Sequence, residues 1–157
     1  MNEQVKKGFG FGIASGIITT LGLIIGLYFS TYSKAVIIGG ILIIAISDAM
    51  SDSLGMHISE EFAGKSVKDI WVASGSTFFF KFLFAIIFAV WFLFFELQTA
   101  IIFSIIWGIF LLVIFSYYLA KIQKNPSFKV ISEHVFIMIL VIVITYFVGN
   151  FIGKVFV

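Results

Sequence analysis

The chain has 157 residues, of which 61% are hydrophobic and 11% are charged, and its mean hydropathy is +1.17. A soluble domain carries about 25% charged residues, so the composition predicts an integral membrane protein with little soluble mass. The basic residues are ten scattered lysines, which argues against a nucleic-acid-binding surface. The absence of cysteine excludes disulfides and thiolate metal sites.

Five apolar segments follow one another, each close to the ~20 residues that a spanning helix needs. We predict helices at about 9–29, 35–58, 70–95, 97–120 and 130–157. The connections are short and polar, and the last contains the only proline, Pro126. The first apolar run is longer than the hydrophobic region of a signal peptide, so we expect it to be retained. The fold class is therefore all-α, with one transmembrane domain over 1–157.

The distribution of lysines predicts the orientation of these helices. With the N-terminus in the cytoplasm, the inner side holds seven lysines: Lys6, Lys7, Lys65, Lys68, Lys121, Lys124 and Lys129. The outer side then holds only Lys34 and Lys154. This bias favours a cytoplasmic N-terminus and an external C-terminus. The exclusive use of lysine is typical of an AT-rich, prokaryotic genome, so we expect a multi-pass protein of the plasma membrane.

Two acidic residues, Asp48 and Asp52, lie inside the second apolar run. A carboxylate near the centre of a spanning helix costs at least ~2.5 kcal/mol, and the i, i+4 spacing places both on one face. Met56 continues this face by one turn, and Ser51 adds a hydroxyl beside it. Divalent cations such as Mn²⁺ and Fe²⁺ accept carboxylate oxygens, and a thioether such as that of Met56 biases a site toward the softer of these metals. Two neighbouring carboxylates also repel each other, which favours a bound proton on one of them.

A second group of candidate ligands follows at the end of the same segment. His57, Glu60 and Glu61 could capture metal from the cytoplasm, because carboxylates and imidazole bind divalent metals. The alternative is an ordinary solvated helix end. Glu133 and His134 lie on the same predicted side and could join the group. Glu133 is equally suited to the first turn of a helix.

Further polar residues could line a path through the membrane: Ser15, Thr19, Lys81 and Asn150. Hydroxyls in a spanning helix can instead bond their own backbone carbonyls. Lys81 could form an ion pair with the two aspartates or extend to the cytoplasmic interface. Three sets of glycines recur at helix-packing spacing: Gly8, Gly12 and Gly16; Gly22 and Gly26; Gly149 and Gly153. They favour close packing within the chain or a dimer seam.

The first two segments resemble the vacuolar iron transporter family. The stretch FGFGIASGIITTLGLIIGL (Phe9–Leu27) is similar to the family's first helix, and GGILIIAISDAMSDSLGMHISEE (Gly39–Glu61) to its second. TYFVGNFIG (Thr145–Gly153) resembles the end of the fifth. The resemblance implies five spans, a homodimer, and export of Fe²⁺ or Mn²⁺ from the cytoplasm against protons along a path between the subunits.

Several positions depart from the family's pattern. The family's helix-one aspartate falls on Ser15, its helix-two methionine on Asp52 and the following glutamate on Met56. An acid is thus lost from the first helix and acids are gained in the second. A site of carboxylate and thioether ligands could still form, with the roles of the two helices exchanged. The family's acidic cytoplasmic insertion between helices two and three is missing, so we expect no separate metal-buffering domain.

The leading hypothesis is a homodimeric, proton-coupled exporter of divalent metal, with Fe²⁺ or Mn²⁺ as substrate and no cofactor. In this hypothesis Asp48, Asp52 and Met56 bind the metal, and Ser15 faces the site. One alternative is a non-transporting membrane scaffold or partner subunit of the same fold. Another is an ion-coupled carrier of a different solute. A membrane-embedded enzyme is disfavoured, because metal-dependent lipid transferases need more than two intramembrane acids.

Overall fold

The computed structural model describes residues 2–156, which form helices and no strand. The helices are α1 (Glu3–Thr31), α2 (Lys34–Phe62), α3 (Val67–Ile86), α4 (Ala89–Phe94), α5 (Leu97–Gln123) and α6 (Ser127–Val155). With α3 and α4 counted together as one span, five helices are long and apolar enough to cross a membrane. The predicted all-α class is confirmed, and the chain is a multi-pass membrane protein by this criterion.

Helices α2 and α3 begin before the predicted apolar segments, at positions where serine side chains cap them. Ser33 accepts a hydrogen bond from the Val36 amide at the start of α2, and Ser66 accepts one from the Asp69 amide at the start of α3. Such caps satisfy amides that the helix itself leaves unpaired. The predicted end of the last helix, residue 157, lies outside the described residues.

The third span is not the single helix predicted over 70–95. It is interrupted at Ile87 and Phe88, and the short α4 completes it. Around the break the Phe88 amide bonds to the Ala85 carbonyl and the Val90 amide to the Ile87 carbonyl, each at 3.3 Å. These are i→i−3 contacts, tighter than α-helical ones. Residues 80–95 contain no proline or glycine, so no local residue marks the break. The break places the fully buried Phe88 against α1.

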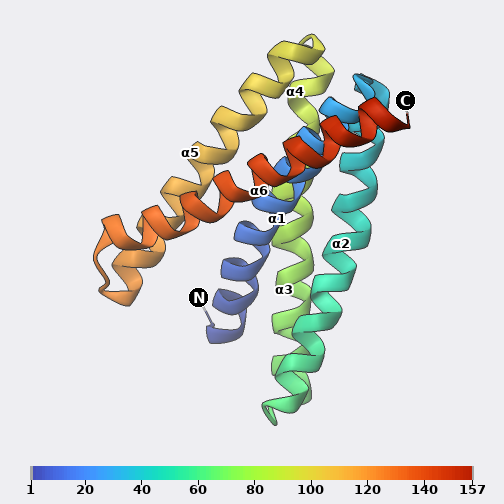
Figure 1. The fold of residues 1–157 in the computed structure, drawn as a ribbon. Coiled ribbons are helices and arrows are strands. Elements are labelled where there is room, and N and C mark those ends of the chain that lie inside the picture. The colour runs from blue at the N-terminus through green and yellow to red at the C-terminus, as the bar shows by residue number, and fades with distance from the viewer. Residues whose placement is uncertain (1, 157) are drawn as a thin grey trace.

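Helix α1 occupies the middle of the bundle (Figure 1). It packs against α2, α3, α5 and α6, and α6 crosses it in the view of Figure 1. In its most apolar stretch 50% of the residues are buried, compared with 11% in α6. The two ends of the chain lie at opposite ends of the bundle (Figure 1), as an odd number of spans requires.

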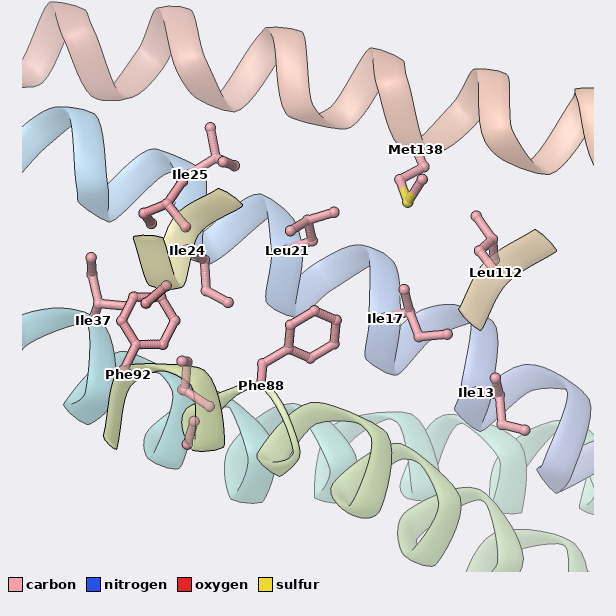
Figure 2. Packing of buried hydrophobic residues seen from close by; sticks show 14 of the residues in the cluster. Ile13, Ile17, Leu21, Ile24, Ile25, Ile37, Phe88, Phe92, Leu112 and Met138 are labelled. Carbon is pink, nitrogen blue, oxygen red and sulfur yellow. The ribbon is translucent and has the colours of Figure 1, made fainter. Parts of the chain in front are cut away.

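The apolar core runs along α1. Ile13, Ile17, Leu21 and Ile24 form a ladder on this helix, and Phe88 lies beside Leu21 and Ile17 (Figure 2). Spacing of three or four residues keeps these side chains on one face. Leu112 from α5 and Met138 from α6 complete the cluster. The core therefore fixes how α3, α5 and α6 sit around α1.

The glycine sets pack within the chain. A Cβ at Gly12 would lie 2.9 Å from the Lys81 amide nitrogen, and one at Gly16 would lie 3.0 Å from the Lys81 carbonyl oxygen. A Cβ at Gly149 of α6 would lie 2.4 Å from the Gly26 carbonyl oxygen. Of the two interpretations of these glycines, internal packing is thus the one that the structure shows. The close approach of α1 to α3 also brings the polar residues described next within reach of each other.

Candidate ion-binding cluster

Four polar side chains from three helices meet inside the bundle. Lys81 Nζ of α3 lies 2.5 Å from Asp48 Oδ2 and in direct contact with Asp52 Oδ2, both on α2. Ser15 Oγ of α1 donates a hydrogen bond to Asp52 Oδ2 at 2.8 Å and accepts one from Lys81 Nζ at 2.9 Å. We call these four residues the aspartate–lysine cluster. Lys81 pairs with the aspartates and does not extend to the interface.

The cluster is buried on one side and open on the other. The Lys81 side chain is 1% exposed, whereas those of Asp48 and Asp52 are 28% and 21% exposed. The Oδ2 atom of each carboxylate points inward to Lys81. An ion that reaches the cluster from the surface of α2 therefore meets carboxylates before it meets the ammonium group.

The backbone explains why these residues meet. The i, i+4 spacing of Asp48 and Asp52 directs both carboxylates to the same side of α2. The glycines of α1 bring its backbone against α3 at Lys81, so the short Ser15 side chain reaches both Lys81 and Asp52. Two neighbouring hydroxyls stay outside the cluster: Thr19 Oγ1 donates to the Ser15 carbonyl at 2.8 Å, and Ser51 is exposed.

The residues at the end of α2 that were predicted to capture metal, His57, Glu60 and Glu61, do not form one cluster. Glu60 is 5% exposed, and its two oxygens accept hydrogen bonds from Lys7 Nζ at 2.9 and 3.2 Å. His57 instead lies 3.3 Å from Ser74 Oγ through Nδ1 and 3.8 Å from Glu61 through Nε2. The structure thus joins His57 to Glu61 and gives Glu60 a different partner.

The other predicted residues lie away from the aspartate–lysine cluster. Met56 is half-buried, one turn beyond Asp52. Asn150 lies on α6 beside Gly149, which packs against Gly26, and Gly26 is about 16 Å along α1 from Ser15 at 1.5 Å per residue.

Glu133 and His134 belong to the α5–α6 end. His134 Nδ1 lies 2.8 Å from Ser116 Oγ. In Figure 1 this end is at a different corner of the bundle from the α2–α3 turn, so the structure does not bring them to His57.

Within residues 2–156, no three acidic or histidine side chains come together in an arrangement that could hold a metal ion. In the aspartate–lysine cluster, two carboxylates share one ammonium group and one hydroxyl. Lys7 and Ser74 were not among the site residues predicted from the sequence. Glu60 is an acid near the end of an apolar helix, and its burial requires a cationic partner. No local pattern in the sequence indicates which lysine is that partner.

Comparison of the chain with protein-family models, with curated proteins and with solved structures finds no match.

Proposed function

We propose that the chain is a membrane transporter that exchanges a divalent cation, with Fe²⁺ or Mn²⁺ as the expected substrate, for protons. The observation that carries this proposal is the pair Asp48 and Asp52, two carboxylates within a membrane-spanning helix that remain 28% and 21% exposed. Ionisable residues in such helices are costly and typically mark ion paths. A purely structural ion pair would be expected to hide both carboxylates.

The charge of the cluster supports proton coupling. Two carboxylates and one ammonium group leave a formal charge of −2 + 1 = −1. A net charge in a low-dielectric environment is unfavourable, so the cluster favours binding of a further positive species. A proton and a metal cation compete for the same carboxylate oxygens. Alternation between the two provides an exchange mechanism without any additional site.

The outer face of α2 supports a homodimer with the ion path between the subunits. Ser47, Ser51 and Gly55 form a row of small residues along this helix, and a Cβ at Gly55 would meet no atom within 4 Å. Asp48 and Asp52 border the row. Small residues allow close approach of a second helix, and a second copy of α2 would shield the partly exposed carboxylates from lipid.

Ser15 supports the proposed kinship with vacuolar iron transporters. It stands where that family has its helix-one aspartate, and it contacts both Asp52 and Lys81. The helix-one position thus faces the helix-two acids, as the resemblance implies. With the lysine-rich side in the cytoplasm, transport would run outward across the plasma membrane of a prokaryote.

A non-transporting scaffold is the second candidate, and the pairing of Lys81 with both aspartates favours it. Metal flux separates the two functions. Wild-type protein, Asp48→Asn/Asp52→Asn and the control Glu96→Gln would be reconstituted into liposomes, and Mn²⁺ flux would be measured under an imposed pH gradient. Glu96 is an exposed acid at the α4–α5 turn. Gradient-dependent flux in wild type and control, lost in the double variant, is expected.

Two results would contradict the proposal. Equal flux in the double variant would remove the aspartates from the path. A folded wild-type protein without Mn²⁺ or Fe²⁺ flux under either gradient direction would favour the scaffold or a different solute.

A further inference from the structure

We infer that Lys81 is a tethered competitor for the transported cation: its ammonium group occupies the binding position and must leave when the cation enters. This inference rests on the proposed function, because it assumes that the two aspartates bind the cation. It adds a role for α3, which neither the composition nor the resemblance assigns.

The geometry around Lys81 Nζ is that of an occupied cation site. Three oxygen atoms surround the nitrogen: Asp48 Oδ2 at 2.5 Å, Asp52 Oδ2 in direct contact, and Ser15 Oγ at 2.9 Å. Lys81 Nζ donates hydrogen bonds to Asp52 Oδ2 and Ser15 Oγ, and it forms an ion pair with Asp48 Oδ2, which accepts no hydrogen bond. Carboxylate and hydroxyl oxygens are also the ligands that hard divalent cations such as Mn²⁺ accept. The same oxygen atoms therefore serve either the ammonium group or a metal ion.

Simultaneous occupation is unfavourable for two reasons. Lys81 holds the inward Oδ2 atoms of both carboxylates, so a metal ion that binds to either Oδ2 atom must share it with the ammonium group. A dication would also lie within a few ångströms of the ammonium group, where the repulsion of like charges is strong in a partly buried site. Binding of the cation and pairing of Lys81 therefore exclude each other.

The displacement would involve the Lys81 side chain and leave its backbone in place. The backbone of Lys81 lies against Gly12 and Gly16, so closely that a Cβ at either glycine would approach it to 3.0 Å or less. The charged groups that face Lys81 within the described chain are Asp48 and Asp52, with Ser15 as the neutral partner. The long lysine side chain is thus the movable part of a rigidly held position.

A purely structural lysine and a competing lysine predict opposite effects of its removal. If Lys81 only stabilises the carboxylates, folded Lys81→Met binds the metal more weakly. If Lys81 competes, Lys81→Met vacates the oxygen atoms and strengthens binding. The sign of the change in Mn²⁺ affinity therefore decides between the two roles.

Mn²⁺ binding would be titrated by calorimetry on the purified full chain in detergent. We expect the dissociation constant of Lys81→Met to fall by about tenfold or more, equivalent to about 1.4 kcal/mol. Lys81→Arg keeps the charge and should show no such gain. Lys81→Met/Asp48→Asn removes one of the ligands and should lose the gain. Size-exclusion profiles and unfolding curves identify the variants that are folded.

A measurement on the wild-type chain covers the case in which Lys81→Met does not fold. Acetylation of each lysine by a small amine-reactive reagent would be followed by mass spectrometry, with and without saturating Mn²⁺. Displacement predicts that Mn²⁺ increases the acetylation of Lys81 relative to the exposed Lys65. Unchanged acetylation would overturn the inference.

The two proposals can fail separately. If the wild type carries Mn²⁺ through the aspartates but Lys81→Met binds it no more tightly, Lys81 is not a competitor and the transport function stands. If neither the wild type nor folded Lys81→Met binds or moves Mn²⁺ or Fe²⁺, the proposed function fails as well. Tight binding by the variant alone would show that Lys81 blocks a competent site.

Discussion

Gly149 of α6 lies directly against the backbone of Gly26 in α1, where an added Cβ would come within 2.4 Å of the Gly26 carbonyl oxygen. The contact joins two helices that are more than 100 residues apart in the chain. Because the obstacle is backbone, it cannot move aside as a side chain would. This pair of glycines therefore sets the distance between α1 and α6.

Substitution at this contact should destabilise the bundle. Gly149→Val is expected to lower the free energy of unfolding by about 1–3 kcal/mol through overpacking, measured by unfolding in detergent. Gly75→Val is the matched control, because a Cβ at the helical Gly75 meets no atom within 4 Å. Equal loss of stability in the two variants would show that helix propensity, and not the contact, is responsible.

The sequence predicts the spans well because the bilayer imposes a simple length requirement on apolar helices. It predicts the break at Ile87 and Phe88 poorly. The i→i−3 contacts there accompany burial of Phe88 beneath α1, which is a tertiary effect without a proline or glycine to mark it. The residues after Phe88 are as apolar as those before it, so hydropathy continues without interruption.

In the candidate site, too, features set by local sequence could be predicted and features set by tertiary contacts could not. Asp48 and Asp52 are evident from sequence, because charge is rare in an apolar run and their spacing places them on one face. Lys81 emerges as a possible partner for the same reason. The pairing of Glu60 with Lys7 spans 53 residues, and no periodicity predicts it. Because of that pairing, Glu60 does not join His57 and Glu61 in the expected metal-capture group.

The proposed α2 seam can be tested by cross-linking, because the natural chain has no cysteine. Single Ser47→Cys and Ser51→Cys variants should form disulfide-linked dimers in membranes on mild oxidation. Phe136→Cys is the control: Phe136 is 66% exposed on α6, away from the proposed seam. Cross-linking of the control alone, or of none of the three, would contradict a dimer through α2.

The predicted orientation places the α2–α3 turn in the cytoplasm and the α4–α5 turn outside. In intact cells, a membrane-impermeant thiol reagent should label Glu96→Cys at once and Lys65→Cys only after lysis. Both positions are exposed, so a difference in labelling reports the side of the membrane. The opposite pattern would reverse the orientation and, with it, the proposed direction of transport.

The charge of Lys81 should also govern stability. Lys81→Met leaves two carboxylates without their ammonium partner, and we expect a loss of about 3 kcal/mol, because breaking a buried ion pair on one side is strongly destabilising. The triple variant Lys81→Met/Asp48→Asn/Asp52→Asn removes the repelling charges as well and should regain most of the loss. Unfolding curves in detergent measure both changes.

The comparison of the single and triple variants separates charge from packing. If the triple variant is as unstable as Lys81→Met, the loss comes from the lysine side chain as a filler between α2 and α3, and the electrostatic account of the cluster is wrong. If stability returns, the cost of Lys81→Met is the repulsion between Asp48 and Asp52. Added Mn²⁺ should then stabilise the single variant more than the triple variant, because a ligand stabilises only the form that binds it.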